Sequence, residues 1–271
     1  SVINPIFVLG LKTMRIKFSK YQGAGNDFVM VDNRSKAYPL TQQQIERLCN
    51  RRFGIGADGL IVLENCLGVD FQMIYYNANG FVGSMCGNGG RCVVAFAKEL
   101  GLINDACDFV AYDGLHSASC ISDGNIALKM TDVSLVKSID DAWQLDTGSP
   151  HLIFFKNNIK DIDVQVDGAA VRNSSLYKEQ GINVNFAERI GDDLVLRTYE
   201  RGVEDETLAC GTGATATAIA AREAGLITED KVLVNVLGGT LEVSFTKNED
   251  AYNNVYLTGD AKFVFNGEVD V

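Results

Sequence analysis

Two cysteines, each followed directly by a glycine, are the residues of this chain best suited to chemistry. Cys86 lies in the segment MCGNGGRC (residues 85–92), and Cys210 lies in ACGTGA (residues 209–214). A cysteine at the start of a helix ionises more easily, because the helix dipole is positive there. The free backbone N–H groups of the same turn can bind a carboxylate. Each segment therefore predicts a reactive thiol beside an anion site.

The two segments belong to a longer repeat. When they are aligned on the cysteines without a gap, identical residues recur at Gly87/Gly211, Gly89/Gly213, Ala97/Ala221, Glu99/Glu223, 101–103/225–227 and Gly114/Gly238. Self-similarity at a fixed offset predicts two copies of one unit. If the copies face each other, two thiols lie on opposite sides of one bound molecule. That arrangement suits the inversion of a carbon stereocentre, with one thiolate removing a proton and the opposite thiol supplying one.

The elements that position these cysteines follow from the hydrophobic pattern. Residues 93–100 form an apolar run before Gly101, and residues 214–224 form an alanine-rich run before Gly225, which predicts two buried helices with glycine at their C-terminal ends. Thr41 caps a short amphipathic helix over residues 43–49 that ends near Arg52. Strand patterns outnumber helical ones in both copies, at residues 15–33, 60–63, 71–76, 109–112, 126–130, 232–236, 241–245, 255–258 and 262–265.

Composition narrows the class of protein. The chain has 271 residues, 46% hydrophobic content and a net charge of −11 without a cluster of Lys and Arg, so we expect neither nucleic acid nor a membrane surface as a partner. Seven cysteines, an odd number without a CxxC pair, favour a reducing compartment, and hence the cytoplasm, over a disulfide scaffold or a zinc site. We expect Cys49, Cys66, Cys107 and Cys120 in the core, with Cys92 buried beside Cys86. Residues 1–13 are a poor signal peptide and are interpreted as an extension.

Residues spread over nearly the whole chain from Met14 resemble the diaminopimelate epimerase family. The resemblance rests on the following segments in this order: 25–28 (GNDF), 54–59 (GIGADG), Asn77, 86–89 (CGNG), 149–151 (SPH), Asn183, 199–202 (YERG) and 209–213 (ACGTG). It implies a cofactor-independent isomerase that interconverts LL- and meso-diaminopimelate, on the route to lysine and the peptidoglycan precursor. It also implies a homodimer, because the family is commonly dimeric, and no metal.

The resemblance implies an α+β fold of two pseudo-symmetric α/β domains, each a mixed β-sheet wrapped around a central helix. We place the N-terminal half at residues 14–131 and the C-terminal half at 132–261. The final strand, within residues 262–271, is expected to return to the first half. The sequence alone places the boundary only between Met130 and Asp146, because no Pro-rich, Ser-rich or charged linker marks it.

The same resemblance assigns roles by matching position. Cys86 and Cys210 become the acid and base pair, and backbone amides of Gly87, Asn88, Gly211 and Thr212 bind the reacting carboxylate. Asn26 holds the reacting end, and the distal amino-acid end is recognised by Asn77, Asn183 and Arg201, since arginine suits a bidentate carboxylate. His151 and Glu200 influence the thiol protonation states, and Glu200 also contacts substrate. Gly59 and Ser149 complete the set of substrate-binding positions.

Several positions depart from the family pattern. The family often has an amide residue where Gly59 stands and Asn where Ser149 stands, and Phe81 and Gly83 replace commoner residues just before Cys86. Ser149 keeps a hydrogen-bonding group that is shorter than Asn, whereas Gly59 offers only its backbone. Tyr75, Tyr76 and Trp143 are assigned to core packing.

Three other interpretations remain open. Proline racemases and hydroxyproline epimerases share the two-cysteine plan, but a proline racemase carries His where Asn88 stands and lacks the Glu200-Arg201 pair. A phenazine-type isomerase shares the fold without the cysteine pair. From a different class, Cys86 and Cys210 form the reversible disulfide of a thiol redox or binding module.

Overall fold

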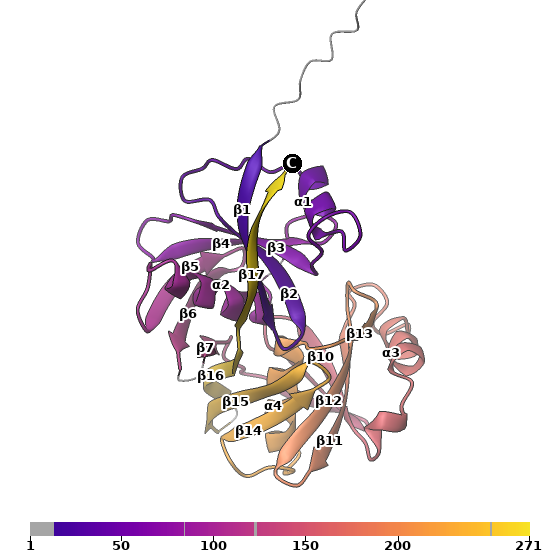
Figure 1. Cartoon of the computed structure of the whole chain (residues 1–271). Helices are drawn as coiled ribbons and strands as arrows, with labels where there is room; N and C mark the ends of the chain where they lie inside the picture. The colour runs from indigo at the N-terminus through magenta and orange to yellow at the C-terminus, as the bar shows by residue number, and fades with distance from the viewer. Residues whose placement is uncertain (1–13, 84, 122–123, 250) are drawn as a thin grey trace, which may run out of the picture.

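The computed structural model describes residues 14–83, 85–121, 124–249 and 251–271, and the structural statements below refer to these (Figure 1). Residues 1–13, interpreted as an extension, lie outside the described residues. Within the described ranges, no helix has the length and apolar character needed to cross a membrane.

The described part of the first half contributes strands β1 to β7, which surround one central helix. The elements are β1 (Arg15–Gly23), β2 (Asn26–Asp32), α1 (Gln42–Cys49), β3 (Gly59–Glu64), β4 (Phe71–Asn77), α2 (Gly87–Glu99), β5 (Ala106–Ala111), β6 (Gly114–Cys120) and β7 (Asn125–Lys129). Helix α1 begins as predicted, because the Thr41 hydroxyl accepts from the backbone of Gln44 while the Gln44 side chain accepts from the Thr41 backbone. It ends at Cys49, earlier than expected.

The second half repeats this plan and adds a return strand. Its elements are β8 (Val136–Ile139), β9 (Ala142–Asp146), β10 (Pro150–Phe155), the 3-10 turn η2 (Ile159–Asp161), α3 (Val164–Arg172), β11 (Asn183–Ile190), β12 (Asp193–Glu200), β13 (Asp205–Thr207), α4 (Gly211–Glu223), β14 (Lys231–Val236), β15 (Gly239–Asn248), β16 (Ala251–Asp260) and β17 (Lys262–Asp270). In Figure 1 the two halves lie one above the other, with α2 inside one and α4 inside the other.

Strand pairing follows the same order in the two halves. In the first, β2–β3 and β4–β5 are parallel, and β1–β2, β3–β4, β5–β6 and β6–β7 are antiparallel. In the second, β10–β11 and β12–β14 are parallel, and β9–β10, β11–β12, β14–β15 and β15–β16 are antiparallel. The predicted α+β class, with two repeated units that each carry a mixed sheet, is therefore confirmed.

The halves are joined through two strands near the end of the chain. Strand β16 pairs with β15 on one side and with β7 of the first half on the other. Strand β17 then pairs antiparallel with β1, and Figure 1 shows it running back into the first half towards the C-terminus. These pairings hold the inner ends of α2 and α4 near one another.

Both central helices are buried, as predicted from their apolar sequences. Helix α2 packs against β1, β2, β3, β4, β6 and β7, and α4 packs against β9 to β12 and β14 to β16. Five alanines and one isoleucine form much of the buried surface of α4, and small side chains let the sheet approach it closely. Gly101 and Gly225 both have φ near +69° after the helix ends, which is the left-handed conformation that glycine favours at a helix C-terminus.

The cysteines predicted to lie in the core divide into two groups. Cys49 and Cys107 are buried and Cys92 is fully buried within α2, as expected, whereas Cys66 and Cys120 are only partly buried. Cys66 follows the end of β3, and Cys120 is the last residue of β6 and packs, partly buried, against the core. The prediction of a core position is therefore wrong for Cys66 and confirmed in part for Cys120.

Candidate active site

The starts of α2 and α4 meet at two glycines. Cys86 is the N-cap residue of α2 and Cys210 is the N-cap residue of α4. A Cβ atom placed on Gly211 would lie 3.6 Å from the Cα of Gly87 and 2.8 Å from a methyl group of Leu257, which also borders Gly87. Only residues without a side chain allow this approach, and it brings the two cysteines into one site between the halves.

Each helix start leaves backbone donors free. The first intrahelical bonds run from the Gly90 N–H to the Cys86 carbonyl at 2.7 Å and from the Ala214 N–H to the Cys210 carbonyl at 2.9 Å. The N–H groups that precede these donors have no partner within the helix, as is general for a first turn. Neither cysteine caps its helix through a side-chain hydrogen bond. Two sets of amides therefore point into the same site, which is a favourable environment for a carboxylate.

The Cys86 thiol faces a mixture of donors, acceptors and charges. Burial raises its pKa and the carboxylate of Glu200 adds to this, whereas the backbone N–H groups of Gly89 and Asn88 and the positive charge of Arg91 lower it. Its Sγ lies 3.6 Å from Oδ1 of Asn26, so the thiol donates to that oxygen.

The Cys210 thiol is 7% exposed and contacts the hydroxyl of Thr212, with Sγ and Oγ1 at 3.4 Å. Burial raises its pKa and Glu200 raises it further, while the Thr212 hydroxyl and the nearby Gly213 backbone N–H oppose this rise. Glu200 therefore acts on both thiols. Burial also raises the pKa of Glu200 itself, although a hydrogen bond from the Thr207 hydroxyl, at 3.0 Å, opposes the rise.

His151 lies behind Thr212 as a neutral, fully buried imidazole. Burial lowers its pKa to about 3, and the nearby Arg201 charge contributes to this. Asn185 Nδ2 approaches the ring Nδ1 at 3.0 Å and also donates to the Leu152 carbonyl at 3.1 Å; a carbonyl can only accept, so the amide nitrogen faces the ring. The ring Nε2 therefore carries the proton and donates to Thr212 Oγ1 at 2.9 Å. Asn185 was not identified from the sequence.

The expected distal-end residues of the second half lie together. Asn183 Nδ2 donates to Ser149 Oγ at 2.8 Å, and Asn183 Oδ1 accepts from the Arg201 backbone N–H at 2.8 Å. The Arg201 guanidinium reaches Ser149 Oγ at 3.4 Å and the Gln180 carbonyl at 3.1 Å. Ser149 thus occupies a position from which it contacts both Asn183 and Arg201 directly.

The first half places Gly59 opposite Asn77, where β3 pairs with β4. A Cβ atom on Gly59 would lie 2.4 Å from the ring of Tyr75, and a Cβ atom on Gly83 would lie 2.7 Å from the same ring. Tyr75 packs against the core, as predicted. Its ring also fills the space where side chains at positions 59 and 83 would stand, which explains why both positions are glycine.

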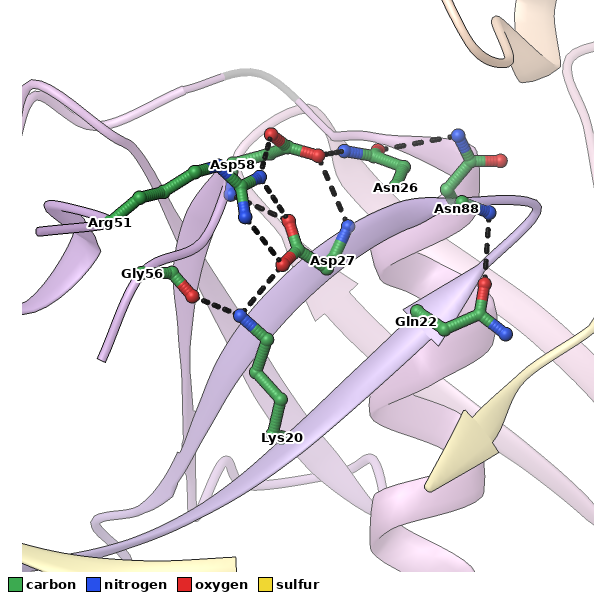
Figure 2. Close-up of polar contacts among 9 residues, drawn as sticks. Lys20, Gln22, Asn26, Asp27, Arg51, Gly56, Asp58 and Asn88 are labelled. Carbon is green, nitrogen blue, oxygen red and sulfur yellow. Dashed lines mark hydrogen bonds and ion pairs between the residues drawn. The ribbon is translucent and has the colours of Figure 1, made fainter. Parts of the chain in front are cut away.

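A charged cluster supports the loop that carries Asn26 (Figure 2). Buried Lys20 contacts Asp27 at 2.7 Å and also donates to the Gly56 carbonyl, and Arg51 bridges Asp27 and Asp58 at 2.7 Å each. Burial alone would raise the pKa of Asp27, but hydrogen bonds and charges from Arg51 and Lys20 hold it well below its usual range. Sequence reasoning missed this cluster, although its acidic members lie in the two glycine-rich loops at residues 23–27 and 54–59.

The described residues offer no group of three or more His, Cys, Asp or Glu side chains that could hold a metal ion. All seven cysteines are free thiols.

Two repeated units, each a mixed sheet around a central helix, define the class of two-domain epimerases and isomerases, and in this chain a cysteine stands at the start of each central helix. The chain belongs to the diaminopimelate epimerase family. The family model "Diaminopimelate epimerase" matches residues 18–136 and 144–264. The chain is 50% identical over 252 residues to a diaminopimelate epimerase from Flavobacterium psychrophilum (92% of this chain, 98% of that protein), and 43% identical over 256 residues to one from Chlorobaculum tepidum (91% and 98%).

Solved structures of low sequence identity share the fold. A phenazine biosynthesis protein of the PhzF family from Bacillus anthracis superposes with a TM-score of 0.72 at 16% identity, covering 94% of this chain and 99% of that chain. A hydroxyproline epimerase from Agrobacterium vitis superposes with a TM-score of 0.67 at 12% identity, covering 95% and 93%. These similarities concern the fold alone.

Proposed function

We propose that this protein interconverts LL- and meso-diaminopimelate without a cofactor, with Cys86 and Cys210 as the acid and base. The observation that carries the proposal is the meeting of two helix starts at Gly87 and Gly211, each with a thiol at its N-cap. Membership of the diaminopimelate epimerase family supports the choice of substrate.

The reaction needs one thiolate and one thiol. The thiolate takes the α-proton from one face of the substrate, and the electron pair of the broken C–H bond moves towards the α-carboxylate. Backbone N–H groups of Gly87, Asn88, Gly211 and Thr212 stabilise the negative charge that develops there. The opposite thiol then donates its proton to the other face, and the electron pair returns to form the new C–H bond. The two cysteines exchange protonation states, and no external acid, base or oxidant is consumed.

Glu200 keeps both thiols basic. Its carboxylate raises the pKa of Cys86 and of Cys210, and a more basic thiolate is a stronger acceptor for a weakly acidic α-proton. The neutral His151 acts through Thr212: the hydroxyl oxygen accepts a hydrogen bond from the imidazole Nε2–H, so the hydroxyl hydrogen is directed to the Cys210 sulfur. His151 is thus a positioning residue for Thr212.

The distal amino-acid end of the substrate is bound by Arg201, Asn183 and Asn77, with Ser149 bridging the first two. Arg201 suits a carboxylate, because its guanidinium presents parallel N–H donors. Asn26 lies within contact of the Cys86 thiol and so holds the reacting end. Gly59 leaves its backbone and the Tyr75 ring as the surface facing the substrate.

A substrate comparison tests this proposal. The purified protein is assayed for epimerisation of LL-diaminopimelate, L-proline and trans-4-hydroxy-L-proline, without any added cofactor. We expect turnover of diaminopimelate alone, because the Glu200-Arg201 pair and Asn183 provide for a second amino-acid end. Turnover of proline or hydroxyproline alone would favour the second candidate, which the shared fold with a hydroxyproline epimerase supports.

We also propose a homodimer and a cytoplasmic location. Phe263, Val264 and Phe265 of β17 are 47%, 52% and 44% exposed, and β17 pairs only with β1 among the described strands, so an apolar strand edge is open to a second copy. Light scattering of the wild type and of Phe263→Asp and Phe265→Asp variants tests the dimer, and a mass of one chain for the wild type would contradict it.

The proposed cytoplasmic location rests on the seven free cysteines, which fit a reducing compartment. For the domain boundary we propose residues 131 and 132, between β7 and β8.

A further inference from the structure

We infer that Asp58 is a positioning residue, which fixes the side-chain amide of Asn26 so that its oxygen, and not its nitrogen, faces the Cys86 thiol. The inference rests on the proposed function where it takes Cys86 as a reacting group. The geometry itself stands apart from that function, because it concerns the orientation of one amide group in the free protein (Figure 2).

The contacts of Asn26 leave a single consistent orientation. Asn26 Nδ2 donates to Oδ2 of Asp58 at 2.7 Å, and the same carboxylate oxygen accepts the backbone N–H of Asp27 at 3.1 Å. An ionised carboxylate can only accept hydrogen bonds, so the amide nitrogen must point towards Asp58. Asn26 Oδ1 is then left on the opposite side, where Cys86 Sγ lies at 3.6 Å and Asn88 Nδ2 at 3.3 Å.

The charged residue Arg91 fixes the side-chain amide of Asn88, which is the hydrogen-bond partner of Asn26. Arg91 is fully buried in α2 and donates to Asn88 Oδ1 at 2.9 Å. A guanidinium can only donate, so Asn88 must present its Nδ2 to Asn26 and to the Ala209 carbonyl, at 3.1 Å. The hydrogen bonds thus run in one direction, from Arg91 through Asn88 and Asn26 to Asp58. Their two charged ends allow neither amide to turn over.

Arg51 and Lys20 hold the acidic end in place. Arg51 binds Oδ1 of Asp58 and both oxygens of Asp27, and Lys20 binds Asp27 from the interior. Figure 2 shows the Asp58 carboxylate between the Arg51 guanidinium and the Asn26 amide. Asp58 itself is 43% exposed, so its side chain is replaceable without opening the core.

An oxygen beside Cys86 has a direct chemical consequence. An acceptor stabilises the protonated thiol, whereas an amide nitrogen in the same place would stabilise the thiolate. The oxygen therefore opposes the backbone donors of Asn88 and Gly89 and keeps the thiolate basic. The other titratable or charged groups that act on Cys86 are Arg91 and Cys92 of α2, Tyr75 of β4, Glu200 of β12 and Cys210 before α4.

The test measures the pKa of Cys86 in the full chain without substrate. The rate of alkylation by iodoacetamide is followed on the Cys86 peptide by mass spectrometry, between about pH 6 and pH 10, where cysteine thiols begin to ionise. Asp58→Asn is expected to lower the pKa of Cys86 by about half a unit to one unit, because the acceptor-only group that binds Asn26 Nδ2 at 2.7 Å is lost and only the longer Asn88 contact, at 3.3 Å, still opposes a turn of the Asn26 nitrogen to the sulfur. Asp58→Glu keeps an acceptor-only carboxylate and is expected to stay close to the wild type.

Asp58→Asn also removes a negative charge, which by itself would lower the pKa of Cys86. A double substitution separates this effect of charge from the effect of the Asn26 amide orientation. In an Asn26→Ala background no amide can turn, so we expect Asp58→Asn to shift the Cys86 pKa by less than half as much as in the wild type. An equal shift in both backgrounds, or no shift in either, would overturn the inference. Asp58→Ala serves as the second variant if Asp58→Asn does not fold. Because no substrate is used, failure of the proposed reaction leaves this result interpretable.

Discussion

The ring of Tyr75 forms part of the surface beside Cys86, because of where its strand pair lies against α2. Gly89 of α2 packs over Ile61 and Met73, and Tyr75 is the β4 residue paired with Ile61. Burial raises the pKa of the Tyr75 hydroxyl most, and the negative charges of Cys86, Asp58 and Glu200 raise it further. The hydroxyl lies 3.1 Å from where a Cβ atom of Gly59, a proposed substrate-binding position, would stand, and its raised pKa keeps it protonated as a donor.

We predict that Tyr75→Phe weakens substrate binding while it leaves the fold intact. The loss of one neutral hydrogen bond corresponds to about 0.5 to 1.5 kcal/mol, or a rise in KM of about 2- to 10-fold. The phenyl ring of the variant still packs edge-on against Phe28, whose centroid lies 6.0 Å away, so the melting temperature is expected to be unchanged. The assay is the initial rate of diaminopimelate epimerisation as a function of substrate concentration.

Tyr76→Phe is the matched control. Tyr76 is the next residue of β4, and it packs, like Ile74, against a separate hydrophobic cluster that includes Val31 and Leu60. It is expected to leave KM unchanged. Equal KM values for the wild type and Tyr75→Phe would refute the reasoning, as would the same rise in both variants. A fall in melting temperature without a change in KM would indicate that Tyr75 serves packing alone.

Two further predictions follow from the charged groups. Asp27→Asn leaves the cation of Lys20, which is 7% exposed, without its carboxylate, and we expect a loss of about 3 kcal/mol in the free energy of unfolding by urea. Asp270→Asn, in an exposed ion pair, is the control and is expected to lose much less, so equal losses would contradict this. Glu200→Gln removes the negative charge that raises the pKa of both thiols, so the alkylation profiles of Cys86 and Cys210 are expected to move to lower pH. A profile that is unchanged or moves to higher pH would rule out this effect.

Much of the fold could be predicted from the sequence because the signals were local or repeated. The helix starts at Cys86 and Cys210 follow from glycines next to apolar runs, and the gap-free repeat predicts two similar units. The burial of both helices follows from their lack of a polar face. These features depend on the spacing of residue types alone, which a single sequence displays.

Helix α3 and strands β9 to β11 lacked local or repeated sequence patterns of this kind. Helix α3 contains Gly168, which disfavours a helix in isolation but is required because a Cβ atom there would lie 2.4 Å from Cβ of Tyr199. Strand β10 begins with Pro150, and its partners β9 and β11 lie on either side of it only in the folded sheet. Their patterns were therefore not identified as strands.

Some of the polar residues around the cysteines could be identified from the sequence, and others could not. Those in recognisable segments, such as Asn26 and Arg201, were identified through resemblance to a family. Asp58 and Asn185 were not, because their roles arise from contacts with residues that are remote in sequence. Arg91 was not identified either, although its partner Asn88 lies three residues earlier on the same helix. A pattern of residue types does not reveal which side of an amide faces a thiol, since this depends on the charges at both ends of a hydrogen-bonded series.

The central claim is that two cysteines exchange the α-proton from opposite faces of one substrate. The most direct test is the incorporation of deuterium from D2O at the α-carbon of LL-diaminopimelate, without cofactor, by the wild type, Cys86→Ser and Cys210→Ser. We predict that the wild type forms deuterated meso product, while neither variant epimerises at more than about a hundredth of its rate, because a serine hydroxyl is a far weaker acid and base in this role. Epimerisation and deuterium incorporation at the wild-type rate in either variant would contradict the account.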